Sequence, residues 1–143
     1  MKYLMVLLSL VSTSVFSQIE VQDAWSRATP PGSKVAVGYM EIRNVGSQPD
    51  RLLSVTSAVA QRVEMHVTQR DGEVMKMRQV QLFEIPARER TTLRPGGSHL
   101  MLVDLAQPLE KGARFVMKLR FERAGELEVE FEVQEIGSRH PRH

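Results

Sequence analysis

The sequence predicts an all-β protein, a single-domain β-sandwich or small Greek-key barrel, and two observations support that fold class. Short runs of alternating apolar and polar residues recur about every ten residues along the chain. Long runs with the 3.6-residue period of an amphipathic helix are missing from the sequence. The chain has 143 residues, a length that suits one domain with its own hydrophobic core.

The first 17 residues have the pattern of a cleaved export signal. Lys2 precedes an apolar run over residues 3–11, and small residues follow it, as in a secretory signal peptide. Cleavage is expected after Ser17, which leaves residues 18–134 as the predicted domain and residues 135–143 as a flexible tail. The apolar run is too short to span a bilayer, so we expect a periplasmic or secreted protein without a membrane anchor.

The alternating runs define the expected strands, and turn residues separate them. The turns are Pro30-Pro31-Gly32, Asn44-Val45-Gly46, Asp71-Gly72 and Pro95-Gly96-Gly97. The expected strands cover residues 18–22, 35–44, 51–56, 62–69, 73–85, 89–93, 99–105, 113–121 and 126–134.

The last two runs predict a hairpin with one apolar face and one charged face. A three-residue loop, Arg123-Ala124-Gly125, would place Arg120 opposite Glu128 and Lys118 opposite Glu130. The row of glutamates could bind a cation, but the basic residues expected across from it favour a solvated face.

Composition limits the possible functions of this chain. The formal net charge is +2, and the sequence lacks the basic patch and interleaved aromatic residues of nucleic-acid binders. The chain contains no cysteine, so it forms no disulfide and offers no thiolate to a metal. A soft-metal site would therefore be built from methionine, helped by histidine.

The segment over residues 64–77 predicts a first pair of histidine and methionine. Asp71-Gly72 is a strong signal for a two-residue hairpin turn. This turn would place His66 directly opposite Met77 on one face, with Cβ atoms about 4.5–5.5 Å apart. Met75 shares the strand face of Met77 and is an alternative ligand.

The segment over residues 98–102 predicts a second pair. In a strand, His99 and Met101 would point to one face while Leu100 and Leu102 point into the core. Bringing the two pairs together would join two imidazole nitrogens with two thioether sulfurs.

Such a set of ligands is soft and neutral, which suits Cu(I). Zinc prefers thiolate, imidazole or carboxylate, and a blue-copper site needs a cysteine. We therefore expect one Cu(I) ion, bound by His66, Met77, His99 and Met101.

The other methionines and histidines have different expected roles. Met40 and Met117 lie in alternating apolar runs, and Met65 points to the face opposite His66, so all three are expected in the core. His140 and His143 lie in the C-terminal tail, where a disordered basic tail is favoured over a secondary metal site, for example for Cu(II).

The spacing of the four candidate ligands resembles the motif of the PCuAC-type periplasmic copper chaperones. That motif is His, ten residues, Met, twenty-one residues, His, one residue, Met, and the chain matches every gap. Residues 23–32, 39–44, 74–78 and 93–102 also resemble the family, and the resemblance extends to about residue 133. One departure is Val67-Thr68-Gln69-Arg70, where relatives often place further His or Met, so no second metal is expected in that loop.

The resemblance implies a cupredoxin-like β-barrel and a monomeric Cu(I) carrier without enzymatic activity. It also implies that the carrier delivers copper for assembly of the cytochrome c oxidase copper site, alongside a thioredoxin-like Sco protein. The residues alone leave two other classes open: a mononuclear copper redox enzyme, which lacks a convergent acid/base pair here, and a metal-free secreted binding module.

Overall fold

One mixed sheet contains every strand of the computed structural model, which describes residues 18–141. The expected signal peptide over residues 1–17 lies outside the described residues, as do residues 142 and 143. Across residues 18–141, no helix is long and apolar enough to cross a membrane. The strands are β1 (Ile19–Arg27), β2 (Val35–Asn44), β3 (Asp50–Ser57), β4 (Ala60–Asp71), β5 (Val74–Val80), β6 (Phe83–Ile85), β7 (Arg90–Leu93), β8 (His99–Leu105), β9 (Arg114–Phe121) and β10 (Gly125–Gln134).

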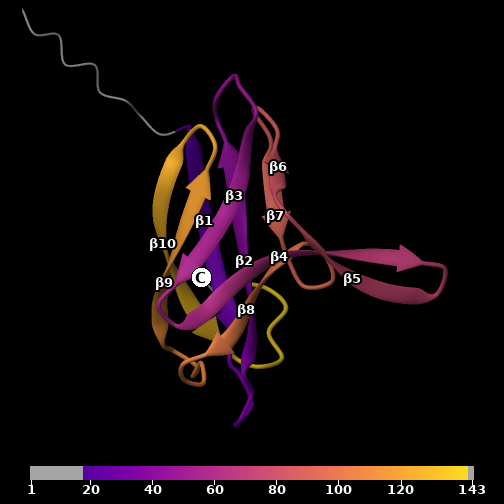
Figure 1. Cartoon of the computed structure of the whole chain (residues 1–143), viewed down its shortest axis with the longest axis vertical. Helices are drawn as coiled ribbons and strands as arrows, with labels where there is room; N and C mark the ends of the chain where they lie inside the picture. Colours follow the sequence, from indigo (N-terminus) through magenta and orange to yellow (C-terminus); the bar gives the residue numbers. More distant parts are fainter. Residues whose placement is uncertain (1–17, 142–143) are drawn as a thin grey trace, which may run out of the picture.

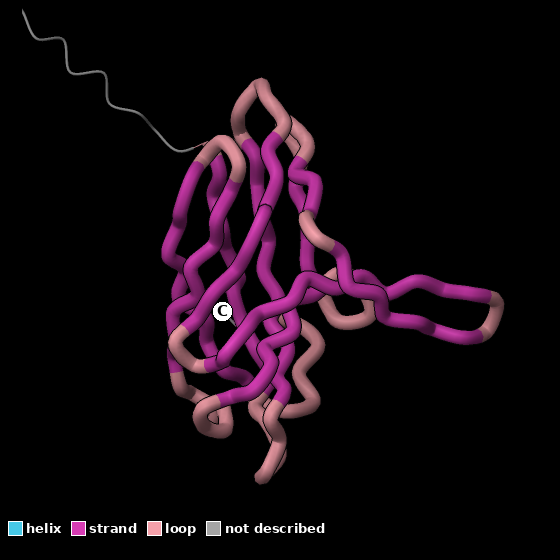
Figure 2. The backbone as a smooth tube through the Cα atoms, in the orientation of Figure 1, coloured by secondary structure: helices cyan, strands magenta, loops and turns pink. Residues whose placement is uncertain are grey.

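The strand order is β5-β4-β8-β2-β1-β10-β9-β3-β6, and β7 also pairs with β2. Figure 1 and Figure 2 show the strands wrapping around a common interior, while the hairpin of β4 and β5 projects away from the body. The β1–β10 pair is parallel and the other pairs are antiparallel. The prediction of an all-β fold is confirmed.

Alternation along the strands produces one continuous core. β9 shows it most clearly, because its residues are exposed and buried in strict turn from Arg114 to Phe121. Met40, Met65 and Met117 are all buried, as predicted. The side chains with the least exposure include Phe121, Phe131, Ile42, Leu52, Leu100 and Leu102.

Two expected strands have different limits in the structure. β1 continues past residue 22 to Arg27, because an irregularity between Gln22 and Trp25 lets the strand resume its pairing with β2. Asp23 adopts a positive φ of 54° at this bulge. The expected strand over residues 73–85 is two strands, since β5 pairs with β4 whereas β6 pairs with β3.

The predicted register of the last hairpin is wrong by two residues. Arg120 pairs with Glu126 and Lys118 with Glu128, because the loop is residues 122–124 and Gly125 already pairs with β9. Gly125 has the expected left-handed conformation, with φ of 76°.

Asp50 accounts for the position of this loop. Its buried carboxylate accepts hydrogen bonds from the backbone N–H groups of Arg123 (2.8 Å) and Ala124 (3.0 Å). The shift of two residues keeps every side chain on its expected face. Opposite charges still meet on the solvated face, for example Arg114 and Glu130 at 2.8 Å.

Candidate metal centre

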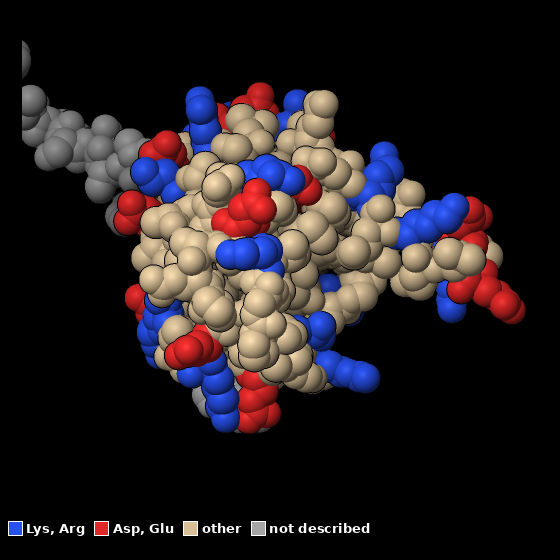
Figure 3. Space-filling view, turned by 60° about the horizontal axis from the view of Figure 1, so that its bottom comes forward, with Lys and Arg blue, Asp and Glu red and all other residues tan. Residues whose placement is uncertain are grey.

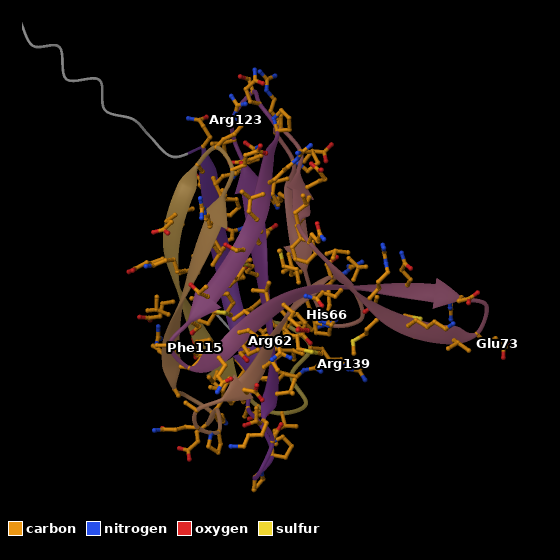
Figure 4. All side chains as sticks on the ribbon, in the orientation of Figure 1. Arg62, His66, Glu73, Phe115, Arg123 and Arg139 are labelled. Atoms are coloured by element: carbon orange, nitrogen blue, oxygen red, sulfur yellow. The ribbon has the colours of Figure 1, made fainter. Side chains whose placement is uncertain are left out.

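The outer face of β5, β4 and β8 brings the two predicted histidines together. His66 on β4 pairs directly with His99 on β8. Their rings are stacked, with centroids 5.5 Å apart and an interplanar angle of 27°. Figure 4 shows His66 at the base of the projecting hairpin, far from Glu73 at the tip.

The core on the other side of β8 sets the direction in which His99 points. Leu100 and Leu102 are both fully buried, so the residues between and beside them, His99 and Met101, face outward. His99 is nevertheless only 5% exposed. Its Nδ1 lies 3.1 Å from the carbonyl oxygen of Gly97 and donates to it, which anchors the ring to the preceding turn.

Glu64 holds the other imidazole. The Nε2–H of His66 donates to Glu64 Oε1 at 3.1 Å, and Arg62 Nε donates to Glu64 Oε2 at the same distance. These two hydrogen bonds lower the pKa of the Glu64 carboxyl, with the His66 contact as the larger cause. A charged acceptor at Nε2 fixes the His66 tautomer with its proton on that atom.

Each imidazole therefore keeps its second nitrogen free. His66 Nδ1 and His99 Nε2 are buried, and neither has a hydrogen-bond partner within the described residues. Burial is the main cause that lowers the pKa of His99, and this shift favours the neutral form of the ring. Two imidazole nitrogens that are buried, unpartnered and carried on stacked rings are suited to bind a metal ion.

The predicted pairing of His66 with Met77 is wrong, again by two residues. His66 pairs with Gln79, and Met77 pairs with Thr68. The turn is Gly72-Glu73, with Gly72 at φ of 63° in the first central position, where type II′ turns place glycine. Met77 stays on the face of His66, but as a diagonal neighbour, with a typical separation of about 7–8 Å between Cα atoms.

The two candidate methionines flank the histidine pair from opposite sides. Met101 pairs with Glu64, two residues from His66 in one direction along β4, and Met77 pairs with Thr68, two residues away in the other. Met101 is half-buried, whereas Met77 is 59% exposed. Met77 would therefore have to turn inward to reach the imidazoles, which its flexible side chain allows.

The remaining candidates lie elsewhere. Met75 is two pairs further toward the hairpin tip, opposite Arg70, on the face of Met77. His140 lines a hollow with Trp25 and Arg94, while His143 lies outside the described residues. In the part of the chain that the structure describes, no three His, Cys, Asp or Glu side chains gather to hold a metal.

Sequence reasoning did not identify two residues that orient the site, Glu64 and Gly97. Glu64 could have been found from its position, because residues two apart in a strand share a face and Glu64 comes two residues before His66. The role of the Gly97 carbonyl was not visible in the sequence, because it depends on the turn before β8, where Gly97 N–H donates to Arg94.

The protein is of the class of all-β domains whose sheet carries two stacked histidines flanked by methionines. Comparisons with known proteins identify the family to which it belongs. The chain belongs to the family described as "LpqE-like: Putative lipoprotein LpqE-like", whose model matches residues 19–133. A relative from Leifsonia xyli subsp. xyli (strain CTCB07), "Putative lipoprotein Lxx21020", is 36% identical over 105 residues. The match covers 72% of this chain and 61% of that protein.

Solved structures with a similar fold are PCuAC domains and a related protein. The copper-bound PCuAC domain from PmoF2 has a TM-score of 0.74 and 31% identity, over 85% of this chain and 97% of that one. The solution structure of CuI-DR1885 from Deinococcus radiodurans has a TM-score of 0.65 and 29% identity, over 78% and 75%. The cupredoxin-like fold expected for this chain is confirmed by these neighbours.

Proposed function

We propose that this chain binds one Cu(I) ion and carries it, and that His66, His99, Met101 and Met77 are its ligands. The observation that carries the proposal is the pair of buried, unpartnered nitrogens, His66 Nδ1 and His99 Nε2, on stacked rings. Thioether and neutral imidazole ligands favour Cu(I). The copper named for the PmoF2 domain and for DR1885 supports the same cargo here.

The arrangement suits carriage without catalysis. The histidines form an oriented half of the site with buried free nitrogens, whereas Met77 comes from an exposed strand. One exposed ligand would let an incoming group replace it without unfolding the core. A thiolate-bearing acceptor would bind Cu(I) more tightly, so transfer would proceed by ligand exchange.

The proposed setting is the periplasm, where the chain would supply copper for the cytochrome c oxidase copper site, alongside a thioredoxin-like Sco protein. Export is supported by the signal-like residues 1–17 and by the lipoprotein description of the family. The acceptor rests on the resemblance to PCuAC-type chaperones. A transfer experiment tests this acceptor. The copper-loaded chain is mixed with a Sco-like dithiol protein, the two are separated by size-exclusion chromatography, and the metal in each is measured.

A Cu(I) titration of residues 18–143 against a competing chelator tests copper binding. The unmodified chain should take up one ion, and the double variant His66→Ala with Met101→Ala should lose it. His140→Ala is the matched control and should bind as before. Unchanged binding in the double variant would refute the assignment of ligands.

X-ray absorption at the copper edge separates the ligand types. Mixed nitrogen and sulfur scatterers are expected for the loaded chain. Oxygen consumption with a reductant present would indicate a copper redox enzyme instead. A chain with no Cu(I) affinity would indicate a metal-free binding module.

A further inference from the structure

The sheet ends in an open edge at β5. This strand is first in the strand order, and among the described residues it pairs only with β4. All of its residues except Val80 are exposed, and Figure 2 shows the hairpin extending well beyond the body. A long exposed edge is a template for pairing with another extended chain, and proteins usually protect such edges.

The register of the hairpin tells which backbone groups are available. Asp71 and Val74 close the two-residue turn, so they form a hydrogen-bonded pair, and such pairs alternate along an antiparallel ladder. Lys76 and Arg78 therefore direct their N–H and C=O groups toward β4. Met75, Met77 and Gln79 direct theirs to the open side, because their pairs are the non-hydrogen-bonded ones.

The two faces of this edge differ in chemistry. Met75 and Met77 lie on the face of the metal site and are 54% and 59% exposed. Lys76 and Arg78 lie on the opposite face. Arg78 makes no ion pair within the described residues, and Lys76 has a single exposed one, with Asp71 at 3.5 Å. Figure 3 shows basic side chains along the hairpin and acidic ones gathered at its tip.

We propose that the open edge of β5 binds an extended acidic segment of the protein that exchanges copper with this chain, by addition of a strand. The proposal rests on the proposed function of the metal site. Backbone hydrogen bonds to Met75, Met77 and Gln79 provide the attachment. Acidic residues of the added strand face Lys76 and Arg78, and the residues between them lie beside Met77, where they can replace it as copper ligands.

Charge argues against a second copy of this chain as the occupant. Antiparallel pairing of β5 with itself places Lys76 opposite Lys76, Lys76 opposite Arg78, or Arg78 opposite Arg78 in the three longest registers that join the open backbone groups. Like charges directly opposite each other destabilise a strand pair. An acidic strand would instead place carboxylates opposite Lys76 and Arg78, and opposite charges attract.

Backbone amide exchange and chemical shifts, measured by NMR, test the proposal on residues 18–143. The probe is an octapeptide of alternating glutamate and methionine, compared with one in which lysine replaces glutamate. With the acidic peptide, protection from exchange should rise at the amides of Met75, Met77 and Gln79, while Lys76 and Arg78 change little. The lysine peptide should leave all of these amides unchanged.

Charge-reversed variants supply the matched comparison. Lys76→Glu with Arg78→Glu should weaken binding of the acidic peptide about tenfold or more. The control Arg120→Glu with Arg123→Glu makes the same change in net charge at the other end of the molecule, where Figure 4 shows Arg123, and should bind as the unmodified chain does.

The outcomes separate this proposal from the copper assignment, because the peptide is tested first on the metal-free protein. Copper binding without the alternating amide pattern would overturn the docking edge and leave the metal site standing. The amide pattern without copper binding would refute the proposed function but not strand addition. Equal binding of both peptides, or a dimer through β5 in sedimentation, would overturn the acidic partner.

Discussion

His66 and His99 stand directly opposite each other on β4 and β8, with ring centroids 5.5 Å apart. Each ring donates one N–H within the protein, His66 to Glu64 and His99 to Gly97. The remaining nitrogen of each ring is buried and has no partner within residues 18–141. The protein has thus oriented two imidazoles before any metal arrives, which reduces the entropy lost on binding.

Replacing Glu64 tests this orientation. Glu64→Ala removes the acceptor at His66 Nε2, so the proton can move to Nδ1 and occupy the free lone pair. We expect Cu(I) affinity to fall about 10–100-fold, the usual effect of losing an outer-shell partner. Nitrogen-15 shifts of the metal-free imidazole should show a mixture of tautomers.

The conservative variant and an exposed neighbour complete the test of Glu64. Glu64→Gln keeps an oxygen acceptor and should restore most of the tautomer preference. Asp104→Asn removes the charge of the other acidic partner of Arg62, keeps a residue that tolerates the positive φ of 58° there, and should change neither measurement. An unaltered tautomer in Glu64→Ala would contradict the role of this carboxylate.

Replacing Met77 and Met75 one at a time tests whether Met77, and not its neighbour Met75, is a ligand as proposed. Met77 is the diagonal neighbour of His66, whereas Met75 lies two pairs further toward the hairpin tip. Met77→Ala should weaken Cu(I) binding by about tenfold or more and reduce the sulfur signal in the copper-edge spectrum. Met75→Ala should have little effect alone; a further loss in the double variant would show that Met75 substitutes for Met77.

Asp50 is expected to stabilise the fold without affecting copper. Its buried carboxylate accepts hydrogen bonds from the backbone N–H groups of Arg123 and Ala124, in the loop that follows the neighbouring strand β9. Asp50→Ala should lower the free energy of unfolding by about 1–3 kcal/mol, because buried donors lose their acceptor. Urea unfolding measures this loss, and replacement of an exposed carboxylate, Glu110→Ala, is the control. Equal stability of the two variants would contradict the stabilising role of the Asp50 carboxylate.

Tyr39 should make stability fall at alkaline pH. Burial raises the pKa of its hydroxyl above 10.0, with a smaller opposing effect from the Arg27 guanidinium, which lies 5.7 Å from the ring centroid. A raised pKa in the folded state means that the unfolded chain releases its proton first. The contribution is therefore complete below pH 10 and is lost as pH rises through the folded-state pKa.

Ultraviolet absorbance provides a direct measurement of this titration. The chain has two tyrosines, Tyr3 and Tyr39, so residues 18–143 contain Tyr39 alone. Its phenolate absorbance should appear at higher pH in the folded protein than in urea. Tyr39→Phe should remove its share of the stability loss above pH 10, and a titration identical in both states would exclude the shift.

The sequence by itself determined the fold class and the face of each strand that carries each side chain. Alternation is a local property with a period of two residues, so Leu100 and Leu102 entered the core while His99 and Met101 faced outward. Both predicted hairpin registers were wrong by two residues, and for the same reason neither error moved a side chain to the other face.

Tertiary structure alone decided which side chains meet. The pairing of β4 with β8 places His66 opposite His99, and no local pattern encodes that contact. The turn at Gly72-Glu73 makes Met77 a diagonal rather than a direct neighbour, and Asp50 holds a loop that follows β9. Register and long-range pairing depend on turn conformation and on the fit of distant strands around one core, which alternation cannot specify.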